Sequence, residues 1–206
     1  MSSPVTLLEA IKNRRSLHKL SDDIKVSDSR IEQILHDAVL HSPSPFNCQS
    51  GRVVLLVKEE HKKFWDIAFE VAKATVAPPI FAAAYEPRIK LFRASYGSIL
   101  FYDDPAALQE MVEKRPMLKD LLPQWVEHAT GMLQYAVWTM LTAEGLGCNL
   151  QHYNPMVNAR ASEQWNIPAT WVLKGQMVFG TPAGPLIEKH VEPAEKRIFT
   201  HGTNKE

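Results

Sequence analysis

Two arginines followed by a serine, Arg14-Arg15-Ser16, are the side chains of this sequence best suited to binding a phosphate group. Planar guanidinium groups form paired hydrogen bonds with phosphate oxygens, and a neighbouring hydroxyl offers a further donor. Lys196 and Arg197 form a second cationic pair near the other end of the chain. Isolated pairs of this kind are also common on solvated surfaces. Two interpretations therefore stay open: ordinary surface charge, or two chain ends that meet at one phosphate.

A second candidate is the segment SPSPFNCQS at residues 42–50. Its prolines restrict the backbone, and the amides of Asn47 and Gln49 each offer donors and acceptors in one plane. This combination predicts a preorganised polar loop that could recognise a planar heterocycle. An ordinary connection between a helix and a strand has a similar composition, so both interpretations remain.

The third candidate is Gly145-Leu146-Gly147, which resembles the start of a dinucleotide-binding fingerprint. Leu150 occupies the position of the third glycine, and a helical pattern instead of a strand precedes the motif. We therefore exclude a Rossmann site and expect a glycine that caps the preceding helix. His152 and Tyr153 follow, either on a substrate face or in a packed aromatic corner.

Composition limits the classes of protein to be considered. The 206 residues contain 23 Lys and Arg against 23 Asp and Glu, so no overall field favours nucleic acid or a membrane surface. Cys48 and Cys148 are too few for a disulfide framework, which favours a reducing, cytoplasmic location and leaves the roles of both residues open. Paired His and Cys spacings and long apolar segments are lacking, so we expect neither a metal site nor a membrane span.

The periodicity of apolar residues predicts the elements that must position these candidates. Helical spacing is expected over residues 6–13, 28–41, 59–73, 80–92, 106–114, 124–144 and 159–165, and strands over 52–57, 95–102, 148–152 and 171–179. A short extended run is expected at residues 195–199. The mixed order indicates an α+β fold in a single domain, residues 1–206. The longest predicted helix is apolar on more than one face and could contact a second subunit.

Taken in order, the Arg-Arg-Ser turn, the SPSPFNCQS loop, the Tyr96-Gly97 pair before a strand and the segment GLGCNLQHYNP resemble the nitroreductase superfamily. The resemblance spans nearly the whole chain, and GLGxNLQHYNP is typical of a compact fungal and bacterial subgroup. It implies a nitroreductase-like fold with a central mixed, mainly antiparallel sheet flanked by helices. It also implies a homodimer with a long central helix at its core and two FMN sites built from both subunits.

The resemblance also implies roles for individual residues. Arg14, Arg15 and Ser16 match the turn that contacts the FMN phosphate and ribityl chain, and His18 matches a cation near the flavin pyrimidine edge. Asn47 and Gln49 match amides that contact FMN from the other subunit, and Lys196 and Arg197 match cations that close on the phosphate. Gly145, Leu146, Gly147, Asn149 and Leu150 match the turn whose backbone lies along the isoalloxazine. His152 and Tyr153, which follow this turn, are the candidates for the substrate face.

Two positions depart from the family pattern. Ser50-Gly51 stands where many relatives have Pro-Trp, so contacts that depend on the tryptophan are not expected here. His18 replaces a more common lysine or arginine, and an imidazole titrates near neutral pH instead of carrying a permanent charge.

The activity implied is that of an FMN-dependent oxidoreductase that uses NADH or NADPH to reduce nitroaromatics, quinones or related flat acceptors. Donor and acceptor share one stacking site in this scheme, which predicts ping-pong kinetics without an essential protein acid or base, because the flavin N5 carries the chemistry. Two alternatives belong to other classes. One is a flavin-binding regulatory or stress-response protein with little turnover, and the other is a flavin-free interaction module.

Overall fold

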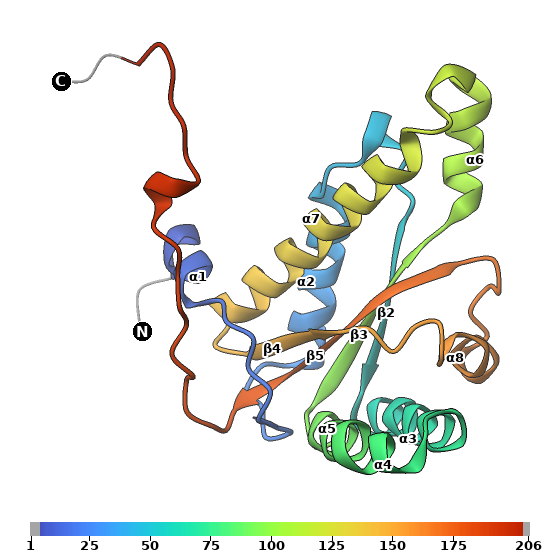
Figure 1. Cartoon of the computed structure of the whole chain (residues 1–206), viewed down its shortest axis with the longest axis vertical. Coiled ribbons are helices and arrows are strands. Elements are labelled where there is room, and N and C mark those ends of the chain that lie inside the picture. The colour runs from blue at the N-terminus through green and yellow to red at the C-terminus, as the bar shows by residue number, and fades with distance from the viewer. Residues whose placement is uncertain (1–4, 204–206) are drawn as a thin grey trace.

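The longest strand, β5 (Val172–Pro182), organises the sheet in the computed structural model, which describes residues 5–203 (Figure 1). The other strands are β1 (Leu20–Ser21), β2 (Gly51–Val57), β3 (Gly97–Asp103) and β4 (Gly147–Gln151). The strand order is β1-β5-β3-β2, and β4 also pairs with β5. All of these pairs are antiparallel, and a parallel bridge joins Ser16 to Cys148. The predicted mixed, mainly antiparallel sheet is confirmed.

Helices cover both faces of this sheet. They are α1 (Leu7–Asn13), α2 (Asp28–His41), α3 (Lys58–Thr75), α4 (Pro78–Ile80), α5 (Glu86–Arg93), α6 (Pro105–Lys114), α7 (Leu122–Ala143) and α8 (Asn158–Trp165). Every residue of strand β3 is buried, and successive side chains point to opposite faces of the sheet. The strand therefore contributes to two hydrophobic clusters, one on each face. Ile99 and Phe101 pack with α2 and α7, whereas Leu100 and Tyr102 pack with α3, α5 and α8.

The C-terminal end of α7 delivers the chain into β4 through a Schellman turn. Gly145 has a φ of 81°, a left-handed conformation that favours glycine. Its N–H donates to the Thr142 carbonyl, and the N–H of Leu146 donates to the Leu141 carbonyl, both at 3.0 Å. These two bonds satisfy carbonyls at the helix end, so the predicted glycine cap is confirmed.

Three expectations about elements need correction. Residues 80–92 are not one α-helix, because a π-helical turn at Phe81–Tyr85 lies between α4 and α5. Pro87 has no N–H to continue the α-helical ladder, which accounts for the irregular turn before it. The extended run expected near residue 195 is instead a 3-10 turn at Ala194–Lys196 that follows Pro193. Strand β2 was expected to be covered on both faces. Side chains of β2 do pack into the hydrophobic clusters on both faces of the sheet, but the strand lies at the sheet edge and most of its residues are half-buried.

Candidate functional site

Strand β4 holds the segment that follows α1 in place. The backbone N–H of Leu17 donates to the Cys148 carbonyl at 2.9 Å, and the Asn149 side chain donates to the Leu17 carbonyl at 2.8 Å. Gly147 permits this close approach, because a Cβ atom there would lie 2.7 Å from Leu20 Cδ2. The structure therefore brings together two of the predicted motifs, residues 14–16 and residues 145–150.

A cationic cavity of about 160 Å³ lies beside this junction and is lined by Arg14, Arg15, Ser16 and Lys189. The Arg14 guanidinium carbon lies 4.7 Å from the centre of the Trp138 ring and 5.9 Å from that of Tyr135. Its Nε atom is buried and has no hydrogen-bond partner among the described residues. Arg14 as a whole is half-buried, but an unpartnered buried donor on a cation is costly, and an anionic oxygen satisfies it well. The cavity therefore fits a phosphate.

The C-terminal segment reaches this cavity through a residue that the sequence reasoning did not select. The Arg15 guanidinium donates to the Ile187 carbonyl, which holds the segment beside α1 and places Lys189 at the cavity. Lys196 and Arg197 are exposed and do not line it, and Lys196 pairs with Glu192 at 3.1 Å. Figure 1 shows the segment running past α1 and away from the sheet. Within one chain, the N-terminal arginines and the C-terminal segment therefore meet at this cavity, and Lys189 is the C-terminal cation that lines it.

His18 lies on the other side of Ser16 in an adjoining cavity of about 200 Å³. Leu91 of α5 and Ile187 of the C-terminal segment also line it. The His18 ring lies 6.4 Å from the Phe92 ring, measured between centroids, at a tilt of 43°. The cavity at the predicted cation position therefore adjoins the phosphate-sized cavity, and the two share Ser16 as a lining residue.

A larger cavity of about 340 Å³ opens where β4 ends, between this strand and α5. Its lining consists of Ala84, Tyr85, Arg88, Gln151, His152, Tyr153, Asn154, Pro155 and Met156. His152 is exposed in it, in keeping with a substrate face. Arg88 was missed by the sequence reasoning, and its helical spacing from Tyr85 is the only local signal that could have pointed to it.

Tyr153 combines the two roles that the sequence left open. It lines the larger cavity, yet its side chain is buried and packs edge-on against Trp65 at 5.2 Å between ring centroids. Burial raises the pKa of Tyr153 to about 12, so its hydroxyl stays protonated at neutral pH. Tyr153 is thus a rigid neutral wall that is anchored in the aromatic core.

The loop with Asn47 and Gln49 lies elsewhere in the chain. Both residues line a separate cavity of about 140 Å³, which shares no lining residue with the cationic cavity. Phe46, Asn47 and Gln49 have φ values of 50°, 57° and 52°. Left-handed conformations of such residues are strained, and they persist where surrounding contacts impose them. One such contact is the Gln49 N–H, which donates to the Ser44 hydroxyl at 3.0 Å.

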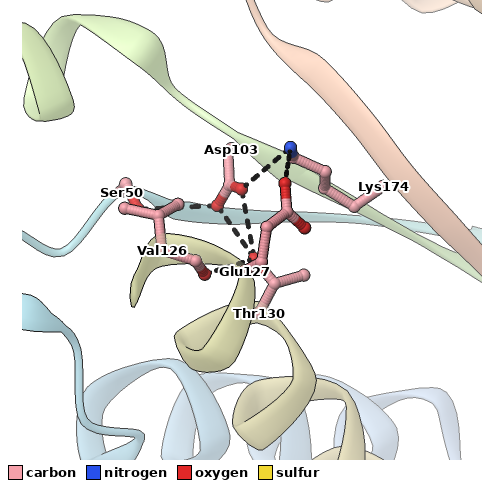
Figure 2. A network of polar contacts seen from close by, with 6 residues as sticks. All are labelled: Ser50, Asp103, Val126, Glu127, Thr130 and Lys174. Carbon is pink, nitrogen blue, oxygen red and sulfur yellow. Dashed lines mark hydrogen bonds and ion pairs between the residues drawn. The ribbon is translucent and has the colours of Figure 1, made fainter. Parts of the chain in front are cut away.

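A buried carboxylate anchors the end of this loop (Figure 2). Asp103 accepts hydrogen bonds from the Ser50 hydroxyl at 3.4 Å and from the Thr130 hydroxyl at 3.1 Å. Lys174 lies 3.6 Å from Asp103 and also pairs with Glu127. Burial raises the pKa of Asp103, and the Lys174 charge opposes that rise. The network ties the loop to β3, β5 and α7, so the strained backbone has rigid support.

Within residues 5–203, every helix is too short or too polar to span a lipid bilayer.

Together, the antiparallel sheet between two helical layers and the cationic cavity beside β4 give the chain an α+β architecture with a site of a size and charge that suit a phosphate. Residues 11–181 match the pattern of the Nitroreductase family. Nitroreductase FRM2 of Saccharomyces cerevisiae is 32% identical over 192 residues, which cover 92% of this chain and 94% of FRM2. The chain therefore belongs to the nitroreductase family of oxidoreductases.

Solved structures agree with this assignment. Nitroreductase CinD from Lactococcus lactis, in complex with chloramphenicol, has a TM-score of 0.84 and 32% identity, with 95% of this chain and 100% of CinD covered. CinD has also been solved with nicotinic acid and with 4-nitrophenol. A nitroreductase with bound FMN from Desulfitobacterium hafniense shares the fold at a TM-score of 0.69 and 16% identity, with 98% of this chain and 100% of that chain covered.

Proposed function

We propose that this protein is an FMN-dependent oxidoreductase that uses NADH or NADPH to reduce nitroaromatics, quinones or related flat acceptors by a ping-pong mechanism. The observation that carries the proposal is the adjacency of a phosphate-sized cationic cavity, strand β4 and a larger cavity with aromatic walls. The ligands named for CinD support it, because 4-nitrophenol and nicotinic acid are flat rings.

Residues of this chain fit the parts of FMN in order. Arg14, Arg15, Ser16 and Lys189 would hold the phosphate, and the backbone of residues 145–150 would lie along the ring system. When bound, FMN supplies a two-electron carrier between the nicotinamide and the acceptor. The protein binds and orients: the Trp138 ring fixes Arg14, and Asn149 fixes the segment that follows Ser16.

The larger cavity at the end of β4 would take the donor and the acceptor in turn. Tyr85 and Tyr153 form aromatic walls, and His152 lies at its exposed side. The buried Tyr153 closes one side of this cavity, and its raised pKa keeps its hydroxyl neutral and weakly acidic at neutral pH. A single site for both substrates supports ping-pong kinetics.

A homodimer completes the site in this proposal, because Asn47 and Gln49 lie away from the cationic cavity of their own chain. A second copy would supply them. Exposed apolar side chains on α1 and α7, among them Leu7, Leu8 and Met132, offer a surface for that contact. The cytoplasmic location expected from the two cysteines, which are both free, stays a prediction.

The decisive experiment is an anaerobic half-reaction. Protein reconstituted with FMN is mixed with NADH or NADPH, and loss of the oxidised flavin absorbance is followed before 4-nitrophenol or a quinone is added. We expect bleaching by at least one nicotinamide and recovery of the colour with the acceptor. A flavin that stays oxidised with both nicotinamides would favour a regulatory flavoprotein instead. Protein that cannot be loaded with FMN would favour a flavin-free interaction module.

A further inference from the structure

The cavity at the end of β4 contains one permanent cation and no acid among its nine lining residues. That cation is Arg88 of α5, and it has no ion-pair partner within residues 5–203. Lys90, two residues later on the same helix, is instead paired with Glu86 at 2.6 Å. Of these two neighbouring cations, only Arg88 has its charge available at a cavity.

The other walls of this cavity restrict the shape of what Arg88 could contact. Tyr85 and Tyr153 present aromatic rings 6.1 Å apart between centroids and nearly perpendicular to each other. Met156 adds an adaptable apolar contact. The turn that carries Ala84 and Tyr85 is π-helical, a conformation that is frequent at functional sites. These walls suit a flat ring.

Amide groups around the cavity are held by the protein. The Gln151 side chain donates to Asn149 at 2.8 Å, and Asn154 accepts from Gln176 at 3.2 Å. Each amide is engaged at one end and carries no charge, so Arg88, the one arginine or lysine in the lining, is the group best placed to bind an anionic substituent. A guanidinium group recognises carboxylates by paired hydrogen bonds.

We infer that Arg88 is a specificity residue that selects flat acceptors with an anionic substituent, such as an aromatic carboxylate. The inference rests on the proposed function, since it assigns the acceptor class of the same cavity. A charge-assisted hydrogen bond gained by the carboxylate corresponds to a preference of about tenfold or more over a neutral ligand of the same shape.

Binding tests this inference with two ligands that differ in charge and not in ring. Benzoate and benzamide are titrated into FMN-loaded protein, and the perturbation of the flavin spectrum gives each Kd. In the wild type, benzoate should bind more tightly. Arg88→Gln should weaken benzoate about tenfold and leave benzamide within about twofold. Lys90→Gln, which removes the same charge from the same helix outside the cavity, should change neither Kd.

Turnover provides a second comparison. The ratio of kcat/KM for 4-nitrobenzoate to that for 4-nitrobenzamide should fall about tenfold in Arg88→Gln. Arg88→Lys, which keeps the charge without the planar fork, should give an intermediate ratio. Comparing ratios between variants removes the difference in intrinsic reactivity between the two nitro compounds.

Several results would overturn the inference. One such result is an equal Kd of the wild type for benzoate and benzamide. Another is an Arg88→Gln variant in which the affinity for both ligands falls by the same factor. Loss of FMN from Arg88→Gln together with both ligands would assign Arg88 to the cofactor instead.

Failure of the inference can be separated from failure of the proposed function. If the wild type holds FMN and reduces both nitro compounds without a preference that depends on Arg88, only the inference is wrong. If the wild type holds no FMN, the proposed function fails. In that case, saturation-transfer NMR can still compare the binding of benzoate with that of benzamide. The inference is overturned if the wild type does not prefer benzoate, or if Arg88→Gln keeps the same preference.

Discussion

The Asn149 side chain donates a 2.8 Å hydrogen bond to the carbonyl of Leu17, a residue 132 positions earlier in the chain. Its carbonyl oxygen accepts from Gln151, also at 2.8 Å, and Asn149 is fully buried. Both ends of the amide are therefore engaged within the protein. Asn149 positions the segment that follows the arginines, and only its backbone remains available to a cofactor along β4.

Asn149→Ala should reduce both stability and cofactor binding. The substitution leaves the carbonyl of the half-buried Leu17 without its side-chain donor, which costs up to about 1–3 kcal/mol. FMN affinity should fall as well, because residues 14–16 lose part of their support. Urea unfolding of the apo-protein and titration with FMN measure the two effects, with Gln33→Ala on the exposed face of α2 as the control. Unchanged stability and affinity would show that the hydrogen bond has no positioning role.

Arg14→Ala should weaken FMN binding by removing a charged donor from the phosphate-sized cavity. A hydrogen bond with a charged group contributes about 1.5–3 kcal/mol, or roughly one to two orders of magnitude in Kd. Arg14→Lys should recover part of the loss, since the charge remains without the fork. Lys114→Ala removes an exposed cation that pairs with Glu110 and serves as the control. An FMN affinity equal to that of the wild type would rule out Arg14 as a phosphate partner.

The buried His61 should make the protein sensitive to acid. Its Nε2 lies 3.1 Å from the Phe92 carbonyl, which can only accept, so Nε2 carries the proton and Nδ1 accepts from Ser98 at 2.9 Å. Burial lowers the pKa of His61 from 6.5 to about 4. A lowered pKa means that the folded state favours neutral imidazole, so this contribution to stability is present above pH 6.5 and lost as the pH falls toward 4.

The loss in the free energy of unfolding caused by His61 is at most about 3 kcal/mol, because each unit by which the pKa is lowered corresponds to about 1.4 kcal/mol. Urea unfolding at pH 7 and pH 4.5 should show a smaller difference in the free energy of unfolding for His61→Gln than for the wild type. His36→Gln, at a side chain that is 62% exposed, should keep the wild-type difference. An identical pH dependence in His61→Gln and the wild type would contradict this assignment.

The sequence predicted the parts of the site that depend on local rules. The glycine cap at Gly145 and the turn that starts at Pro45 before β2 follow from backbone preferences that neighbouring residues reveal. The positions of Lys189 and Arg88 could not be predicted in this way. Each cation reaches its cavity because distant segments pack together, as when Arg15 binds the Ile187 carbonyl. The local sequence around Lys189 does not reveal that packing, and the helical spacing of Arg88 from Tyr85 shows only that the two residues share a face of the helix.

The π-helical turn before α5 illustrates a related limit. Apolar spacing over residues 80–92 predicts an uninterrupted helix, since the period of the pattern changes little over one irregular turn. Pro87 was the available signal for a defect, but a proline in the first turn of a helix is also ordinary. The irregular turn matters for the site, because it carries Tyr85 to the wall of the larger cavity.

The proposed dimer leads to a prediction about α7. Met132 is 43% exposed on this helix, and Val172 at the start of β5 is 42% exposed. Met132→Glu should weaken self-association, because it places a charge in the contact surface, and should lower FMN retention by removing the second copy's Asn47 and Gln49. Val172→Glu makes the same chemical change at equal exposure and should leave both unchanged. Sedimentation velocity with simultaneous flavin absorbance measures mass and cofactor together, and a wild-type monomer that retains FMN would contradict the shared site.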